Sequence, residues 1–231
     1  MALATYKDLC LDATDPAVLG EFWASALALE LHHQDGGDVY LTGPTPQHTI
    51  WVNRVPEPKT VKNRMHLDVG VAGRDGLQAL IDAGARVVDD ESFSWIVMAD
   101  PEGGELCAFV REGERAVGMP QIYEIGVDTT DSPEASRRIA AWWADLLGAE
   151  VADDDGYSYV GRIPGAPFET LDFVPVPEPK TVKNRVHLDV TTDSVEALVA
   201  AGARVLRERD DEIAWTVLAD PEGNEFCAFT P

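Results

Sequence analysis

Two histidines occupy the same place in a phrase that the chain contains twice. The phrase reads EPKTVKNRMHLDV around His66 and EPKTVKNRVHLDV around His187, and an aspartate, Asp68 or Asp189, follows each histidine by two positions. Residues two apart on a β-strand leave the same face, so each carboxylate is expected beside its imidazole. A carboxylate in that place fixes the tautomer of the ring and raises its basicity. Each pair is therefore a candidate catalytic general base, and the alternative is that the acid caps a neighbouring loop.

Two cysteines recur in the same way. Cys107 lies in ADPEGGELCAF and Cys227 in ADPEGNEFCAF, whereas Cys10 is matched by Gly126 in the second half. Thiolate, imidazole and carboxylate are all zinc ligands, and softer metals accept the same set. The opposite interpretation is that a cysteine in an apolar strand behaves as a small hydrophobe. We expect no metal cofactor, and a divalent metal is the alternative.

Aromatic and basic residues near these positions are candidates for contact with a ligand. Aromatic side chains suit planar ligands. The arginines of the two PEPKTVKNR loops either hold an anionic ligand at the mouth of a cavity or bridge carboxylates and lock neighbouring elements together. The candidate ligand-binding residues are Trp51, Arg64, His66, Trp95, Cys107, Phe109, Tyr159, Phe173, Arg185, His187, Trp215, Cys227 and Phe229.

The chain contains two copies of one sequence pattern, and the candidate residues lie within these copies. Besides the histidine phrase, AGARV occurs in both halves, and LDATDP in the first half answers VDTTDSP in the second. An internal repeat determines the architecture of a chain. We therefore divide the chain into two tandem domains, residues 1–115 and residues 120–231, joined near REGERAVGMPQ.

Each copy contains two modules of the order strand, helix and three strands. In the first copy YKDLCLDAT and RMHLDVGV alternate as strands do, and apolar residues at helical spacing follow each of them. Asp15 is the expected N-cap of the first helix, with Pro16 at its first position, and Gly84 is expected to close the second helix. One module cannot bury both faces of its sheet alone. We expect two modules to pair into a curved, cup-like mixed sheet with helices outside, which is an α+β fold with a small-molecule site on its concave face.

The composition excludes several classes of partner. The chain carries 41 acidic and 18 basic residues, for a net charge of −23, and this charge repels nucleic acid and anionic membrane surfaces. We find no secretory signal and no apolar run of about 18 residues that would span a membrane. Three cysteines form no disulfide framework. We expect a cytoplasmic monomer or homodimer that takes a small-molecule ligand.

The repeated motifs, taken together and in order, resemble the vicinal oxygen chelate superfamily in its glyoxalase-like and bleomycin-resistance branch. In metal-using members, the resemblance implies, one ligand comes from the opening strand of a domain, one from the strand that opens its second module and one from its final strand. These positions fall near Asp8, His66 and Cys107 in the first copy, and near Glu124, His187 and Cys227 in the second copy. The final-strand ligand is often a glutamate in the family, and here it is a thiol.

Three functions remain open at this point. The resemblance implies a protein that binds a small molecule in its concave pocket, and an aromatic molecule is one candidate. The alternatives are a metal-dependent isomerase, lyase or dioxygenase of the same superfamily, and a structural or regulatory module without a ligand. The two copies also differ, since Trp51 of the first copy is matched by Asp172 of the second. One copy is therefore expected to bind a ligand while the other supports it.

Overall fold

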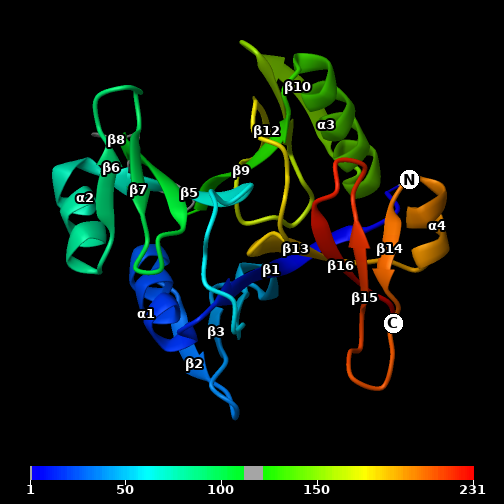
Figure 1. The fold of residues 1–231 in the computed structure, drawn as a ribbon, viewed down its shortest axis with the longest axis horizontal. Coiled ribbons are helices and arrows are strands. Elements are labelled where there is room, and N and C mark those ends of the chain that lie inside the picture. The colour runs from blue at the N-terminus through cyan, green and yellow to red at the C-terminus, as the bar shows by residue number, and fades with distance from the viewer. Residues whose placement is uncertain (1, 112–121) are drawn as a thin grey trace.

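The computed structural model describes residues 2–111 and 122–231, and the predicted boundary between the copies, residues 115–120, lies outside them (Figure 1). Four modules follow one another along the chain. The first consists of β1 (Thr5–Ala13), α1 (Pro16–Leu27), β2 (Glu30–His33), β3 (Val39–Thr42), a short 3-10 helix (Pro46–His48) and β4 (Ile50–Arg54). The second consists of β5 (Met65–Ala72), α2 (Gly73–Asp82), β6 (Arg86–Asp89), β7 (Ile96–Ala99) and β8 (Glu105–Arg111).

The second copy repeats this order of elements. Its first module consists of β9 (Ile122–Thr130), α3 (Pro133–Leu147), β10 (Glu150–Asp154), β11 (Tyr157–Gly161) and β12 (Thr170–Val176). Its second module consists of β13 (Val186–Thr191), α4 (Val195–Ala200), β14 (Arg204–Arg207), β15 (Thr216–Ala219) and β16 (Glu225–Phe229). The predicted order of strand, helix and three strands is therefore present four times.

Two mixed sheets of eight strands hold the four modules. Sheet A has the order β14-β15-β16-β13-β1-β4-β3-β2, and sheet B has the order β10-β11-β12-β9-β5-β8-β7-β6. In the middle of each sheet the opening strands of two modules pair antiparallel, β1 with β13 and β5 with β9. The α+β class with two curved mixed sheets and helices outside agrees with the sequence prediction.

The partner of each module differs from our expectation. We expected the two modules of one copy to share a sheet, but sheet A joins the first module to the fourth and sheet B joins the third to the second. The two modules of one copy meet through their helices and turns instead, since α1 contacts α2 and the Trp142 indole of α3 donates a hydrogen bond of 2.8 Å to Ala201 O at the end of α4. Figure 1 shows α1 and α2 on one side of the molecule and α3 and α4 on the other. Each concave face is consequently built by both copies.

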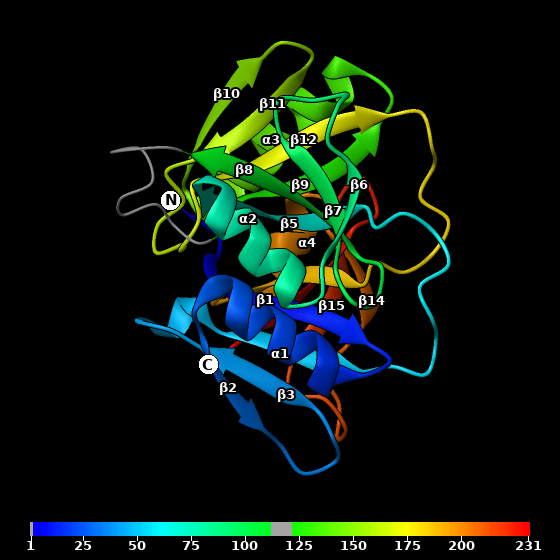
Figure 2. The same cartoon turned by 90° about the vertical axis from the view of Figure 1, so that its left-hand side faces the viewer.

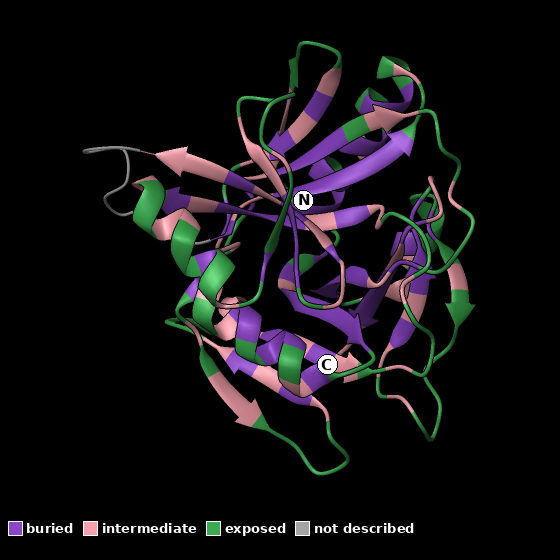
Figure 3. Cartoon of the chain, turned by 60° about the vertical axis from the view of Figure 1, so that its left-hand side comes forward, coloured by how far each residue is buried: buried purple, intermediate pink, exposed green. Residues whose placement is uncertain are grey.

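The alternation along the central strands separates the core from the concave faces. In β1, Leu9 and Leu11 enter the hydrophobic core while Cys10 faces the other way; in β13, Leu188 enters the core while His187 faces the other way. Figure 3 shows that the central strands are buried along most of their length and that the helices keep an exposed face. The helices cover the apolar side of the sheets, so the polar residues of the strands are left for the concave side.

Local signals placed the helix ends correctly. Asp15 is the N-cap of α1, and its side chain accepts a hydrogen bond from Val18 N. Gly84 follows α2 with a φ of +117°, a conformation in the left-handed region that glycine adopts without strain.

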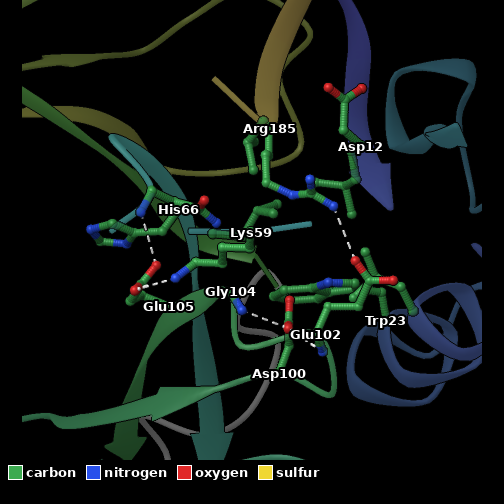
Figure 4. A pocket seen from close by; sticks show the side chains of 14 residues that line it. Asp12, Trp23, Lys59, His66, Asp100, Glu102, Gly104, Glu105 and Arg185 are labelled. Carbon is green, nitrogen blue, oxygen red and sulfur yellow. Dashed lines mark hydrogen bonds and ion pairs between the residues drawn. The ribbon is translucent and has the colours of Figure 1, made fainter. Parts of the chain in front are cut away.

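The PEPKTVKNR loops fasten one copy to the other. The Arg64 guanidinium donates to Glu178 O at 2.6 Å, and the Arg185 guanidinium donates to Glu57 O at 2.7 Å. Figure 2 shows the two loops side by side along one edge of the molecule. Arg185 also forms an ion pair of 3.1 Å with Glu102, which in turn accepts hydrogen bonds from the backbone of Thr14 and Asp15 (Figure 4). Of the two interpretations of these arginines, this geometry favours the one in which they lock neighbouring modules together.

The turn before the last strand of each copy differs between the copies at one residue, Gly104 in the first and Asn224 in the second. In the second copy Asn224 donates to Asp220 Oδ2 at 3.2 Å and accepts from the Asn184 amide at 2.9 Å. In the first copy Gly104 stands in that place, and burial raises the pKa of the adjacent Asp100 to about 6. A Cβ at residue 104 would lie 2.5 Å from Asp100 Oδ2, so the Asp100 carboxylate has to move when a side chain is added there.

We expect Gly104→Asn to raise the free energy of unfolding by about 1 kcal/mol, because it supplies a hydrogen-bond donor to a buried carboxylate. The matched control is Asn224→Gly, which should lower it by a similar amount. Urea unfolding of both variants at neutral pH measures the change. A loss of stability in Gly104→Asn would show that the first copy cannot accommodate the arrangement of the second.

Candidate functional site

Sheet A encloses a cavity of about 530 Å³ on its concave side. This volume lies within the range of about 300–1,000 Å³ that is typical of small-molecule sites. The side chains that line it come from both copies of the chain. They are Lys7, Cys10, Asp12, Gln34, Asp38, Trp51, Asn53, Lys183, His187, Asp189, Arg207, Ile213, Trp215, Val217, Glu225, Cys227 and Phe229.

Aromatic rings form two walls of this cavity. On one side Trp215 of β15 packs against Phe229 of β16, with ring centroids 5.4 Å apart. On the other side Trp51 of β4 packs against Tyr40 of β3 at 5.0 Å. The Lys7 ammonium lies 4.2 Å from the centre of the Phe229 ring. Five predicted ligand-contact residues, Trp51, His187, Trp215, Cys227 and Phe229, are thus brought together here.

The floor of the cavity is polar and buried. His187 Nε2 lies 3.5 Å from Cys227 Sγ and 3.5 Å from Asp189 Oδ1. Cys10 Sγ lies 3.6 Å from the other oxygen of Asp189. His187 is 7% exposed and Asp189 is 2% exposed, and His187 Nδ1 and Asp189 Oδ1 have no hydrogen-bond partner among the described residues.

Burial controls the protonation of this floor. Burial, with a smaller contribution from Lys183, lowers the pKa of His187 to about 3, so the ring is neutral near neutral pH. Burial and then the neighbouring Asp8 carboxylate raise the pKa of Asp189 well above its ordinary value. Burial and then Asp189 raise the pKa of the Cys10 and Cys227 thiols. In sheet A burial, and not Asp189, therefore determines the pKa of His187.

The concave face of sheet B carries a different set of polar groups. His66 Nδ1 lies 2.8 Å from Asp68 Oδ1, and the same oxygen accepts a hydrogen bond of 2.7 Å from Cys107 N. Burial alone would lower the pKa of His66, but the Asp68 carboxylate outweighs it and the pKa is raised. The pair in sheet B thus has the arrangement of a carboxylate-supported base, which we expected at both histidines.

Two further carboxylates lie on this face. Glu124 of β9 is the cross-strand partner of Asp68, and burial, followed by Asp172 and Asp68, raises the pKa of Glu124 to about 8. Burial raises the pKa of Asp172 of β12 to about 6. Glu124 corresponds to Asp8 of sheet A, whereas Asp172 lies where sheet A has the Trp51 ring.

A row of four aromatic rings lies beside these polar residues of sheet B. Trp95 stacks on Phe93 at 5.0 Å and on Phe109 at 5.7 Å, and Phe109 packs against Tyr123 at 4.9 Å. The Arg111 guanidinium lies 5.1 Å from the centre of the Tyr123 ring. The predicted ligand-contact residues Trp95 and Phe109 are therefore neighbours. They lie at sheet B and do not line the cavity of sheet A. Tyr159 of β11 lies next to Asp172 in the same sheet.

The orientation of each histidine depends on the residue opposite it in the neighbouring strand. His66 faces Gly126, and a Cβ at residue 126 would lie 2.4 Å from His66 Cε1. His187 faces Cys10, whose side chain occupies the equivalent space. The ring of His66 can therefore lie over β9, but the ring of His187 cannot lie in the same way over β1.

Some sequence predictions for the site need correction. We grouped Asp8 with His66 and Cys107, but Asp8 is the cross-strand partner of Asp189 in sheet A. In the same way Glu124 belongs with His66, Asp68 and Cys107 in sheet B, and not with His187 and Cys227. The reason is the pairing of modules from different copies.

Three residues lie away from the two concave faces. Phe173, which we expected in the cavity wall, is 1% exposed and packs in the hydrophobic core, on the opposite side of β12 from Asp172. Arg64 and Arg185 line a separate cavity of about 750 Å³ between the two PEPKTVKNR loops. Cys10 is a member of the floor that we did not include, and its alternation with Asp8 and Asp12 was the signal that could have found it.

The model of one protein family matches both copies of the chain. It describes a glyoxalase-like domain, and it matches residues 8–109 and residues 124–229. The chain belongs to the glyoxalase-like family. The resemblance that the repeated motifs suggested is confirmed at the level of domain and fold.

Solved structures share the fold of this glyoxalase-like protein at low sequence identity. Glyoxalase I from Zea mays is 12% identical, with a TM-score of 0.69 over 97% of this chain and 92% of that chain. A putative dioxygenase from Bacillus subtilis is 14% identical, with a TM-score of 0.64 over 99% of this chain and 86% of that chain. No curated protein sequence shows a significant match. Within the described residues, no helix combines the length and apolar character needed to cross a membrane.

Each concave face of the glyoxalase-like protein carries one group of side chains that fits a metal ion by donor type and spacing. The donor atoms of His66, Asp68 and Cys107 all lie within 4.8 Å of one another. The donor atoms of Cys10, His187 and Asp189 do so as well. Imidazole, carboxylate and thiolate together suit zinc and its neighbours.

Proposed function

We propose that this glyoxalase-like protein binds a small molecule with a planar aromatic part in the cavity of sheet A. The observation that carries the proposal is the cavity of about 530 Å³, which is lined by Trp51, Trp215 and Phe229. Offset and edge-to-face contacts with a ring are worth about 0.5–1.5 kcal/mol beyond the area that they bury. A planar ligand that stacks on Trp51 or on Trp215 would gain such contacts.

The polar residues of the cavity supply orientation. His187 is neutral near neutral pH, so its unpartnered Nδ1 is free to take part in one further hydrogen bond. Lys183 and Arg207 at the lining supply cationic groups, although Lys183 already pairs with Asp12 and Arg207 with Asp210. A few polar groups among apolar walls are typical of sites that fix the orientation of a ligand.

Quinoline and 1-naphthol, titrated separately, test this proposal through isothermal calorimetry and the melting temperature. We expect Trp215→Ala to weaken binding by about tenfold, which is the loss of one stacked ring. Trp95→Ala, at the matching position of sheet B, is the control and should leave binding unchanged. Failure of both probes to bind, or equal losses in the two variants, would contradict the proposal.

A second candidate function follows from sheet B, where we propose a metal-dependent enzyme of the superfamily type. His66, Asp68 and Cys107 would hold the ion, and a divalent metal bound there would act as a Lewis acid. Glu124, with a pKa of about 8, is able to hold or accept a proton near neutral pH. Elemental analysis of protein purified without chelator tests this candidate. Stoichiometric metal that is lost in His66→Ala supports it, and metal-free protein that fails to take up added zinc would eliminate it.

A further inference from the structure

We propose that the chain forms a two-fold homodimer through β6, the outermost strand of sheet B. In this dimer β6 lies antiparallel to β6 of a second copy, so the same residues, Arg86–Asp89, form both sides of the contact. Of the monomer and the homodimer expected from the sequence, the proposal selects the homodimer and assigns its interface. It concerns the outer edge of a sheet and is independent of any ligand in the cavity of sheet A.

The strand β6 has one edge without a partner in its own sheet. Sheet B ends at β6, which pairs with β7 on its inner side and lies at the opposite end of the sheet from β10 (Figure 1). The outer edge of such a strand presents backbone N–H and C=O groups that are able to pair with another chain.

Apolar side chains are exposed along this edge. Val87 is 42% exposed and Val88 is 53% exposed, and Phe93, in the turn that follows β6, is 51% exposed. The register with β7 shifts between Val87 and Asp89, so Val88 is the extra residue of a β-bulge. Because a bulge interrupts a regular ladder, we expect the contact to depend on these side chains more than on a long row of backbone hydrogen bonds. A second copy would remove them from water.

The charges at the two ends of β6 are self-complementary. Around a two-fold axis between Val87 and Val88, Arg86 of each copy lies opposite Asp89 of the other. Opposite charges that face one another across paired strands are favourable. Arg86 is exposed, and the Asp89 carboxylate accepts two hydrogen bonds of 3.0 Å from backbone N–H groups of the following turn, which hold it at the end of the strand. The charge pattern therefore selects a second copy of this chain as the partner.

The other edge strands in the described part of the chain lack this combination. β14 occupies the place of β6 in the second copy, and pairing with itself would put Arg204 opposite Arg207. In β10 the same operation would put Glu150 opposite Asp154. β2, with the sequence ELHH, has a half-buried leucine and no large exposed apolar side chain. Self-association is therefore expected at β6 and opposed by like charges at β14 and β10.

The strength of the dimer is limited by its size and by net charge. A contact made by one short strand and its turn is expected to bury less than about 1,200 Å², which is typical of weak, reversible association. Each copy carries a net charge of −23, so two copies repel one another at low salt. At physiological salt the screening length is about 8 Å, so distant charges contribute little and the local pairs at β6 decide the outcome.

Sedimentation velocity of the intact chain over a wide range of protein concentration, at physiological salt, tests the proposal. We expect a reversible equilibrium between monomer and dimer. Arg86→Asp should weaken dimerisation by at least about tenfold, because two attractive pairs become two repulsive pairs. Arg74→Asp, at an exposed position of α2, changes the net charge equally and is the matched control, which should leave the equilibrium unchanged.

A mixing experiment separates charge pairing from any damage to the fold. Asp89→Arg alone should also be monomeric, but an equal mixture with Arg86→Asp should form a heterodimer, because each acidic end then meets an arginine. Native mass spectrometry distinguishes this heterodimer from either homodimer. An intact chain that stays monomeric at every concentration, a dimer that persists in Arg86→Asp, or a mixture that does not associate would overturn the proposal. Growth beyond the dimer would overturn it as well, since a two-fold contact closes on itself.

Discussion

The first copy expressed alone, as residues 1–115, is expected to give dimers or aggregates and no folded monomer. Its opening strands β1 and β5 pair with β13 and β9 of the second copy along their length. Without these partners both strands expose unpaired N–H and C=O groups at a sheet edge, and such edges associate with other chains.

Light scattering and far-ultraviolet circular dichroism of the two separate fragments measure this effect. A dimer is the ordered alternative to aggregation, because β5 of a second fragment can take the place of β13 beside β1. Mixing residues 1–115 with residues 120–231 should restore a complex with one copy of each fragment and the spectrum of the intact chain. A monomeric first fragment with a cooperative unfolding transition would show that a single copy completes its own sheet.

The order of elements was predictable, but the pairing of modules was not. Alternation and helical spacing show which face of a segment is apolar, and the helix start at Asp15 has its own chemical signature. The four opening strands share one pattern, so alternation does not distinguish β13 from β5 as the neighbour of β1. The choice depends on how the helices and the PEPKTVKNR loops fit together across the chain.

The residues of the candidate site were likewise predictable only in part. His66, His187, Cys107 and Cys227 were recognisable because they recur, and each lies on a concave face. Cys10 was passed over because it has no counterpart.

Strand phase explains the remaining difference at the site. Phe173 was assigned to the cavity although its neighbour Asp172 is the residue of β12 on the concave face, and in a strand a shift of one residue changes the face. The opposite pKa shifts of the two histidines depend on contacts that no single-residue pattern describes.

Trp143→Ala is expected to lower the free energy of unfolding by about 3–5 kcal/mol, the usual cost of removing a buried tryptophan side chain. Trp143 of α3 is 2% exposed and packs edge-on against Phe226 at 5.3 Å. Its indole N–H also donates to Asp220 Oδ2 at 3.1 Å. Since α3 belongs to the third module and Phe226 and Asp220 belong to the fourth, this side chain holds the two modules of the second copy together.

Trp143→Phe separates packing from the hydrogen bond, and its cost is expected to depend on pH. Burial raises the pKa of Asp220 above its ordinary value, while backbone and indole donors lower it in part. The folded state therefore retains a proton that the unfolded state releases, so stability falls as pH rises from the unfolded pKa, about 3.9, to the folded pKa. Removing the indole donor raises the folded pKa further and lengthens that window. The loss in Trp143→Phe should be about 1–3 kcal/mol at pH about 8 and smaller at pH about 4.5.

Urea unfolding of Trp143→Ala and Trp143→Phe at both pH values measures these costs. Trp23→Phe is the matched control in the first copy, because Trp23 makes no hydrogen bond to Asp100 in the part of the chain that the structure describes. Its cost should be independent of pH, because the substitution removes packing and no hydrogen bond to Asp100. If Trp143→Phe costs as much as Trp143→Ala, or costs the same at both pH values, the Asp220 hydrogen bond does not contribute in the way that the geometry indicates.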